Sequence, residues 1–364
     1  MHKFLDIDPK IIRIIKELQQ SGYETYVVGG AVRDLLLGHI PKDYDISTAA
    51  TPEEICKVFG RRHTIIIGKR FRLVHYRMGK EIIEISTFRR SPGRTDRNHP
   101  KFGQLPEKMI VDDNNFGSSK EDAFRRDFTV NALFYDPVKE EIIDYTGNGL
   151  KDIESKTVRV IGEPDIRFEE DPVRMLRALK LIGRFDFALD SEAENSLFAN
   201  MDKIRHVPVS RMTLELEKVL SSCYVDTMLE AFHDYGLLPY FLPFFAGKWE
   251  TPEMEEALSL IFERNCQVSS GELRNSISLA MACLSLPFVR SEINQKQCRT
   301  AEASENIISQ AFKPQTMVKR LLFAAAKTIN IYLSEKKPRN SQTHTSTYKH
   351  AMELKNIVAN SQKN

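Results

Sequence analysis

Short apolar runs alternate with amphipathic segments in the first part of the chain, a pattern typical of strands and helices in alternation. Isoleucines recur at helical spacing in residues 11–21, which predicts an amphipathic helix. The apolar run "ETYVV" (24–28) predicts a buried strand, "AVRDLLLG" (31–38) a short helix, and "YDIST" (44–48) the next strand. We therefore expect this part of the chain to form a sheet with helices packed on it.

Two further strand-like runs follow, "RFRLVHYR" (70–77) and "EIIEISTF" (81–88), and the short turn between them predicts a β-hairpin. The next residues, 90–116, are rich in Pro, Gly, Asp and Asn and show little apolar periodicity, which predicts a long mobile loop.

From Asp171 to about Leu333 the apolar positions follow helical periodicity. Prolines are expected to break these helices, at Pro208, Pro239, Pro243, Pro252, Pro287 and Pro314. The tail 334–364 is polar and basic, and we expect it to be disordered or weakly helical. The predicted fold class is α+β: a small N-terminal domain with a mixed or antiparallel sheet and helices, followed by an all-helical region.

The composition is that of a globular protein, with 41% hydrophobic and 28% charged residues. A chain of 364 residues is long enough for two or three domains. No run approaches the roughly 18 apolar residues of a membrane helix, and the N-terminus lacks a secretory pattern, so we expect a cytoplasmic protein with no membrane partner. Five scattered cysteines, never spaced as CxxC, favour reduced thiols over disulfides or a zinc site.

Positive charge is concentrated between residues 61 and 101, although the net charge of the whole chain is only +2. This stretch contains twelve basic and three acidic residues. Two interpretations fit the excess: a solvated basic face without a ligand, and a track for a phosphate backbone.

Two aspartates, Asp43 and Asp45, stand either side of a tyrosine at the start of a predicted strand. Alternate residues of a strand project to the same face, so their Cα atoms would lie roughly 6 to 7 Å apart. Such carboxylates repel each other unless a cation neutralises them, and Mg²⁺ takes one or two carboxylates together with substrate phosphates. Upstream, Gly29 and Gly30 allow the backbone to approach a phosphate, with Arg33 one turn later as a charge partner.

Four stretches in order resemble the motifs of the class II template-independent nucleotidyltransferases, the family that holds bacterial poly(A) polymerases and tRNA CCA-adding enzymes. The first is "YVVGGAVRDLLLGHIPKDYDIST" (26–48), and "EDAFRRDFTVNALFYD" (121–136) follows it. The others are "DYTGNGLKDI" (144–153) and "GEPDIRFEEDPVRMLRALKL" (162–181). The resemblance covers about residues 23 to 245 and implies a small nucleotidyltransferase palm followed by a helical neck and body.

The resemblance implies two-metal phosphoryl transfer, with Asp43 and Asp45 holding two Mg²⁺ ions and ATP as the substrate. It assigns Asp127 to the catalytic cleft as the third carboxylate, and Glu84 is a second candidate on the metal side. Arg125 and Arg126 are matched in the family by residues that contact the phosphate and ribose of the nucleotide, and Arg126 is the favoured residue of the two.

The stretch "EEDPVRMLR" matches the segment that reads the incoming base in this family. The resemblance gives this role to Glu170, Asp171 and Arg174, with Arg177 on the same helix face one turn later. A carboxylate accepts from an exocyclic amine while an arginine donates to the adjacent ring nitrogen. Adenine and cytosine both present that pattern, so these residues explain the acceptance of ATP and of CTP alike.

Residues 66–75, "IIGKRFRLVH", resemble a pattern of bacterial poly(A) polymerases, with Tyr76 as a departure after it, and residues 228–243 resemble their neck. We therefore expect a polynucleotide adenylyltransferase that extends the 3′ end of mRNA or other single-stranded RNA. A CCA- or A-adding enzyme acting on tRNA is the alternative, and a catalytically dead RNA-binding scaffold is a lesser one. The tail is shorter and less basic than the extension usual in the poly(A) branch, which bears on processivity.

The predicted domains follow the same resemblance. Residues 1–155 are expected to form the catalytic domain and 156–245 the helical neck that reads the base and binds RNA. Residues 246–333 are expected to form an RNA-binding helical body, before the tail.

Overall fold

The computed structural model describes residues 3–68, 72–79, 81–90, 115–312, 317–334 and 343–362. These residues form two compact units. Unit 1 comprises Met1–Arg174 and Phe187–Asn200, and unit 2 comprises Met175–Asp186 and Met201–Asn364. The division differs from the boundaries expected at residues 155, 245 and 333. Residues 156–174 belong to unit 1 and not to a separate neck, and the ion pair of Arg159 with Asp152 at 3.1 Å is one of the contacts that join them to it.

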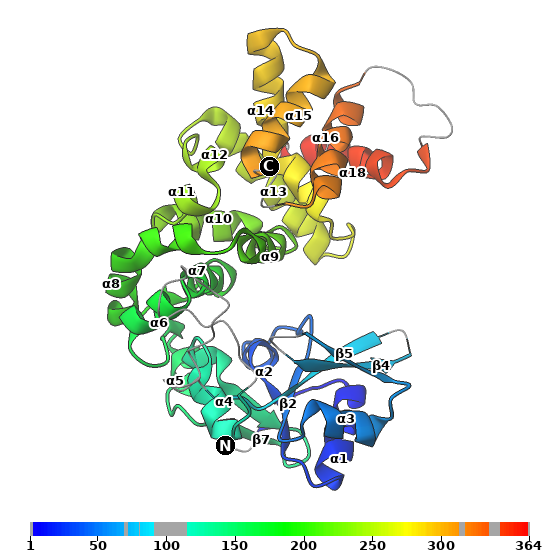
Figure 1. Cartoon of the computed structure of the whole chain (residues 1–364). Helices are drawn as coiled ribbons and strands as arrows, with labels where there is room; N and C mark the ends of the chain where they lie inside the picture. Colours follow the sequence, from blue (N-terminus) through cyan, green and yellow to red (C-terminus); the bar gives the residue numbers. More distant parts are fainter. Residues whose placement is uncertain are drawn as a thin grey trace, which may run out of the picture. The chain divides into compact units, whose positions relative to one another are not determined.

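A mixed sheet with strand order β3-β4-β5-β2-β1-β6-β7 forms the centre of unit 1 (Figure 1). Neighbouring strands are antiparallel except for β2 and β5, which are parallel, so the predicted mixed sheet and the predicted β4–β5 hairpin are confirmed. The strands are β1 (Thr25–Val28), β2 (Asp45–Thr48), β3 (Thr64–Ile67), β4 (Leu73–Met78), β5 (Glu81–Thr87), β6 (Leu133–Asp136) and β7 (Glu141–Asp144).

Helices cover the sheet of unit 1 on both faces. The sequence pattern of α1 buries Ile11, Ile14, Ile15 and Leu18, as expected for an amphipathic helix. The helices of unit 1 are α1 (Pro9–Gln20), α2 (Gly30–Leu36), α3 (Pro52–Phe59), α4 (Ser119–Arg125), α5 (Gly149–Glu154), α6 (Pro164–Glu170) and α8 (Ser191–Asn200), with the 3-10 turn η2 (Thr129–Asn131). A small parallel pair, β8 (Thr157–Val158) and β9 (Ala188–Leu189), completes the unit.

The two faces are packed by different helices. The ring of Phe59 in α3 lies 4.4 Å from the ring of Tyr76 in β4, on one face. On the other face, Ala123 of α4 belongs to a buried cluster with Tyr26, Val28 and Phe134 of β1 and β6.

Unit 2 is helical in its described residues, as predicted. Most of α7 (Val173–Phe185) belongs to it. Its other helices are η3 (Met201–His206), α9 (Val209–Leu220), α10 (Val225–Asp234), α11 (Leu238–Phe241), α12 (Pro243–Ala246), α13 (Pro252–Ser269), α14 (Ile277–Lys296), α15 (Thr300–Phe312), α16 (Lys319–Leu333) and α18 (Ser346–Ser361).

One expectation about the helical part is wrong, and another is narrowed. Helix α14 continues through Pro287, where a break was expected, because residues 278–289 are all buried and tertiary packing sustains the helix. The tail was expected to be disordered or weakly helical, and residues 346–361 form the helix α18, which buries Ala351, Leu354 and Ile357. The apolar spacing of that helix was masked by its polar average composition.

The other proline positions behave largely as expected, since Pro208, Pro243 and Pro252 stand at helix starts. Pro314 and most of the predicted loop 90–116 lie outside the described residues. All five cysteines are free thiols. In the part of the chain that the structure describes, no helix combines the length and apolarity needed to cross a membrane.

Candidate active site

The two candidate metal-binding aspartates, Asp43 and Asp45, lie at the start of strand β2. The strand begins at Asp45, and Asp43 lies in the preceding bend, so the expected alternation of both residues along one strand is wrong. Lys42-Asp43-Tyr44 curves into the strand instead, and both carboxylates remain exposed. Asp43 and Asp45 still line one pocket of about 660 Å³, together with Glu84.

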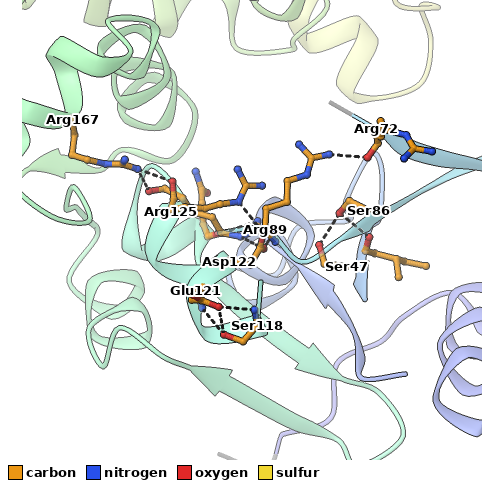
Figure 2. Close-up of polar contacts among 12 residues, drawn as sticks. Ser47, Arg72, Ser86, Arg89, Ser118, Glu121, Asp122, Arg125 and Arg167 are labelled. Atoms are coloured by element: carbon orange, nitrogen blue, oxygen red, sulfur yellow. Dashed lines mark hydrogen bonds and ion pairs between the residues drawn. The ribbon is translucent and has the colours of Figure 1, made fainter. Parts of the chain in front are cut away.

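Glu84 is placed beside Asp45 by the parallel pairing of β2 and β5. Ile46 is in register with Ile85, and the hydroxyls of Ser47 and Ser86 lie 2.9 Å apart (Figure 2). Glu84 and Asp45 each precede this aligned pair, and both line a second, smaller pocket of about 100 Å³. His75 on β4 lies 3.3 Å from the Glu84 carboxylate.

Asp127, the other candidate third carboxylate, accepts hydrogen bonds from residues close to it in the chain. Its Oδ1 accepts from the side-chain amide of Asn131 at 3.0 Å and from the backbone N–H of Phe128 at 2.9 Å. It is not among the residues that line the two pockets. Of the two candidates, the structure thus places Glu84, and not Asp127, around the same pocket as the paired aspartates.

The carboxylates fit the requirements of a hard divalent cation. Among the described residues, no group of three His, Cys, Asp or Glu side chains is close enough to hold a metal ion by itself. Exposed carboxylate oxygens are nevertheless the ligands that Mg²⁺ prefers, and this ion normally takes its remaining ligands from water and substrate phosphates. Asp43 and Asp45 therefore suit an ion that arrives with a nucleotide.

The Gly-Gly turn brings the backbone against the side chain of Arg126. Gly29 has φ +73°, and a Cβ built on it would lie 2.8 Å from Arg126 Nη1. The guanidinium of Arg126 is held there by the carboxylate of Asp122, which accepts a hydrogen bond from Nη2 at 2.9 Å. The same guanidinium lies 5.3 Å from the centre of the Phe134 ring. Arg126 also lines the smaller pocket with Asp45 and Glu84. Asp122 is buried, but the charges of Arg126 and Arg125 outweigh that burial and hold the pKa of its carboxyl below the usual range.

A side chain at Gly29 is expected to disturb this site. The Gly29→Ala variant should lose about 1–3 kcal/mol of stability, because its φ suits glycine alone, and its methyl group should displace Arg126 and lower kcat/KM for the nucleotide. Thermal unfolding and steady-state kinetics measure the two effects. Gly38→Ala is the matched control, since Gly38 has φ +78° and no atom of the described residues lies within 4 Å of a Cβ built on it. Equal kinetics in both variants would contradict the role given to the close approach.

Arg33, expected as a phosphate partner, is directed into the protein. It is only 7% exposed. Its Nη1 donates to Asn131 Oδ1 at 2.5 Å and its Nη2 to Asp34 at 2.5 Å. Since Asn131 also donates to Asp127, the structure links Arg33 to that carboxylate through a shared amide.

Arg167, which the sequence argument did not single out, connects two motifs. Its Nη2 donates to the backbone carbonyls of Arg125 and Arg126 at 2.6 and 2.7 Å (Figure 2), and its Nη1 donates to Glu170 at 2.9 Å. Arg174 Nη1 in turn donates to the carbonyl of Arg167 at 2.6 Å. Arg167 lies inside the quoted stretch 162–181, but its reach across about forty residues of chain could be seen only in the fold.

The predicted base-reading residues share this corner of unit 1. Asp171 ends α6, and its Oδ1 accepts from the N–H of Val173 at 3.3 Å, consistent with the expected cap before α7. Burial and the nearby charge of Arg167 lower the pKa of Arg174 to about 10, against the opposing influence of Asp171, Asp127 and Glu170. The guanidinium is still protonated at neutral pH.

Arg177 has a different setting, since it belongs to unit 2. Its Nε lies 3.5 Å from Glu215 of α9, and Lys180 contacts the same carboxylate. Burial opposes ionisation of Glu215, but the charges of Lys180, Arg177 and Lys218 together hold the pKa of its carboxyl below the usual range. The expected pairing of Arg177 with the base-reading residues thus stays a prediction.

Comparison with known proteins identifies the same family that the sequence motifs indicate. The family described as "Poly A polymerase head domain" matches residues 25–159, and the one described as "Probable RNA and SrmB- binding site of polymerase A" matches residues 186–248. "Poly(A) polymerase I" of Haemophilus influenzae is 38% identical over 65% of this chain and 52% of its own length. The protein of that name from Escherichia coli O6:H1 is 34% identical over 87% of this chain and 70% of its own length.

Solved structures share the fold over nearly the whole chain. The Bacillus stearothermophilus CCA-adding enzyme in complex with CTP is 27% identical and has a TM-score of 0.58, over 97% of this chain and 83% of that one. The chain spans about half the length (52%) of the Haemophilus relative. On these motifs, this fold and these matches, the chain belongs to the nucleotidyltransferase family of the poly(A) polymerases and CCA-adding enzymes.

Proposed function

We propose that the chain is a template-independent polynucleotide adenylyltransferase, which transfers AMP from ATP to the 3′ end of RNA and releases pyrophosphate. The observation that carries this proposal is the grouping of Asp43, Asp45 and Glu84 around one pocket, in a chain 34–38% identical to proteins named poly(A) polymerase I. RNA 3′ ends and ATP are the partners that this reaction requires.

Asp43 and Asp45 are the residues that would hold Mg²⁺. When bound, the metal would lower the pKa of the RNA 3′ hydroxyl and neutralise charge on the triphosphate. For the third carboxylate, proximity favours Glu84, which shares both pockets with Asp45. Asp127 suits a different role, since it accepts a hydrogen bond from Asn131 and its negative charge favours the protonated form of Arg174.

The remaining residues bind and orient the nucleotide. Arg126, fixed by Asp122 beside the Gly-Gly turn, would bind the triphosphate. Arg167 donates hydrogen bonds both to the backbone carbonyl of Arg126 and to the carboxylate of Glu170. The same side chain would thus position the phosphate-binding and the base-reading residues. Arg174 and Asp171 would then recognise the amine and ring nitrogen of the base.

Base selection should depend on the planar guanidinium of Arg174, whose N–H groups would donate to the base. Arg174→Lys keeps the positive charge but loses the planar donor geometry, so kcat/KM for ATP should fall by about 10- to 100-fold and discrimination against GTP should weaken. Single-nucleotide incorporation with each of the four nucleotides measures this. Arg13→Lys, an exposed change on α1, is the control. Unchanged selectivity in Arg174→Lys would exclude this residue from base reading.

The alternative is a CCA- or A-adding tRNA nucleotidyltransferase, which the likeness to a solved CCA-adding enzyme supports. The deciding experiment incubates the protein and Mg²⁺ with a generic single-stranded RNA or with a tRNA lacking CCA, each with ATP, CTP or both. A ladder of A residues on the generic RNA supports the proposal. Addition of C-C-A on the tRNA alone would overturn it, and no addition to either RNA would favour an inactive RNA-binding scaffold.

A further inference from the structure

One face of the sheet connects the candidate carboxylates to the edge strand β3. Ile65 of β3 is in register with His75 of β4, and His75 with Glu84 of β5. Asp45 continues this row, since it precedes the aligned pair of β2 and β5. Residues opposite one another in neighbouring strands project to the same face. The row Ile65, His75, Glu84, Asp45 is therefore one continuous line of side chains.

A second row lies on the same face, two residues along each strand. Arg77 of β4 is opposite Ile82 of β5. His63, just before β3, accepts at its backbone carbonyl from the N–H of Arg77 at 2.7 Å. These two rows place aliphatic and basic side chains together next to Asp45 and Glu84.

This face is covered at one end of the sheet and accessible at the other. Over β1 and β6, Ala123 of α4 packs on Val28 and Phe134. Over β3 and β5, Ile65 is 58% exposed and Ile82 is 56% exposed. The opposite face is buried on β4 and β5, where Val74 and Ile85 are 0% exposed, whereas Ile66 of β3 on that face is 36% exposed. Exposed isoleucines beside the candidate carboxylates indicate a surface that another molecule covers.

We propose that this face of β3, β4 and β5 binds the RNA strand just upstream of its 3′ end, an inference that rests on the proposed function. Strands lie about 4.8 Å apart, so the three spacings from Asp45 to Ile65 span about 14 Å. A 3′ end at Asp45 would thus place the preceding nucleotides over the row. Sheet faces of this width bind two or three bases of single-stranded RNA in other proteins.

The chemistry of the face favours nucleic acid over a protein partner. On this face, Ile65, Ile82 and the His75 ring offer apolar and flat contacts to bases, while the exposed Arg77 offers charge to phosphates. The basic stretch found in the sequence begins on this edge of the sheet. The proposed reaction requires an RNA 3′ end to reach Asp45 and Glu84, at the end of this face. It places no such requirement on a protein partner.

The first test removes the aliphatic contacts. The double variant Ile65→Ser/Ile82→Ser should bind a 5′-labelled 15-nucleotide single-stranded RNA about five-fold more weakly by fluorescence anisotropy. In assays of AMP addition its KM for RNA should rise by a similar factor, while the KM for ATP stays the same. Val138→Ser, at an exposed position in the turn between β6 and β7, is the control and should match the parent protein.

The second test separates charge from apolar contact. For the parent protein, the logarithm of RNA affinity falls linearly with the logarithm of salt concentration. Arg77→Ala should reduce that slope by about 0.7, the value for one phosphate contact on a single strand, whereas the isoleucine variant should keep the slope. Arg13→Ala, on α1, is the charge-matched control.

These outcomes separate the two proposals. RNA affinity and KM unchanged in both face variants would overturn the RNA-binding face, even if AMP addition is normal. Absence of nucleotide addition by the parent protein would overturn the proposed function, and the anisotropy data would then still decide whether RNA occupies this face.

Discussion

Replacing Asp45 by asparagine is expected to lower kcat for AMP addition by on the order of 10³-fold, and Asp43→Asn should act similarly. The substitution keeps the shape of the side chain but removes the negative charge that would hold the divalent cation at the 660 Å³ pocket. Gel-resolved primer extension in Mg²⁺ measures the rate, and anisotropy measures RNA binding. Thermal unfolding should be nearly unchanged because both carboxylates are exposed.

Asp6→Asn is the matched control, since this exposed carboxylate is not among the residues that line the pocket. Glu84→Gln and Asp127→Asn then identify the third carboxylate. If Glu84 is a ligand, its variant should need a higher Mg²⁺ concentration for half-maximal rate, whereas Asp127→Asn should chiefly raise the KM for ATP. Full activity in Asp45→Asn would contradict the catalytic role proposed for the aspartate pair.

The second large effect is expected in unit 2, on stability. Arg264 of α13 is 0% exposed, and its Nη1 donates to the carbonyl of Ser222 at 2.6 Å and to Asn265 Oδ1 at 2.8 Å. Its Nη2 reaches the carbonyl of Leu220 at 3.5 Å and contacts Asn275. The guanidinium thus satisfies the carbonyl end of α9, which no intrahelical donor can serve.

Arg264→Ala should therefore cost about 3 kcal/mol, because it leaves several buried polar groups without a partner and opens a cavity. For a unit of this size the loss corresponds to a fall in Tm of roughly 6–12 °C, which calorimetry of the full chain would detect. Arg274→Ala, an exposed arginine ten residues later, should shift Tm little. An equally small shift for Arg264→Ala would show that water replaces the guanidinium at no cost.

Much of the catalytic unit could be predicted from local pattern. The strand 24–28, the hairpin 70–88 and the amphipathic helix after Pro9 depend on side-chain periodicity and turn residues, which act within a few residues. That the strand of Glu84 could pair beside that of Asp45 was expected, but the parallel direction and register of β2 and β5 were not visible, because parallel strands join segments about forty residues apart. That pairing alone puts Glu84 beside Asp45.

The sequence by itself determined the family motifs, the candidate aspartates and the division into a mixed sheet and helices, since these reside in residue types at fixed spacing. Only the tertiary structure decided that Arg33 is directed to Asn131, that Arg167 joins two motifs, and that α18 folds. The physical reason is that burial and hydrogen-bond satisfaction depend on partners distant in the chain. A buried guanidinium is directed to whichever carbonyl or carboxylate the fold brings within 3 Å, and local spacing does not encode that choice.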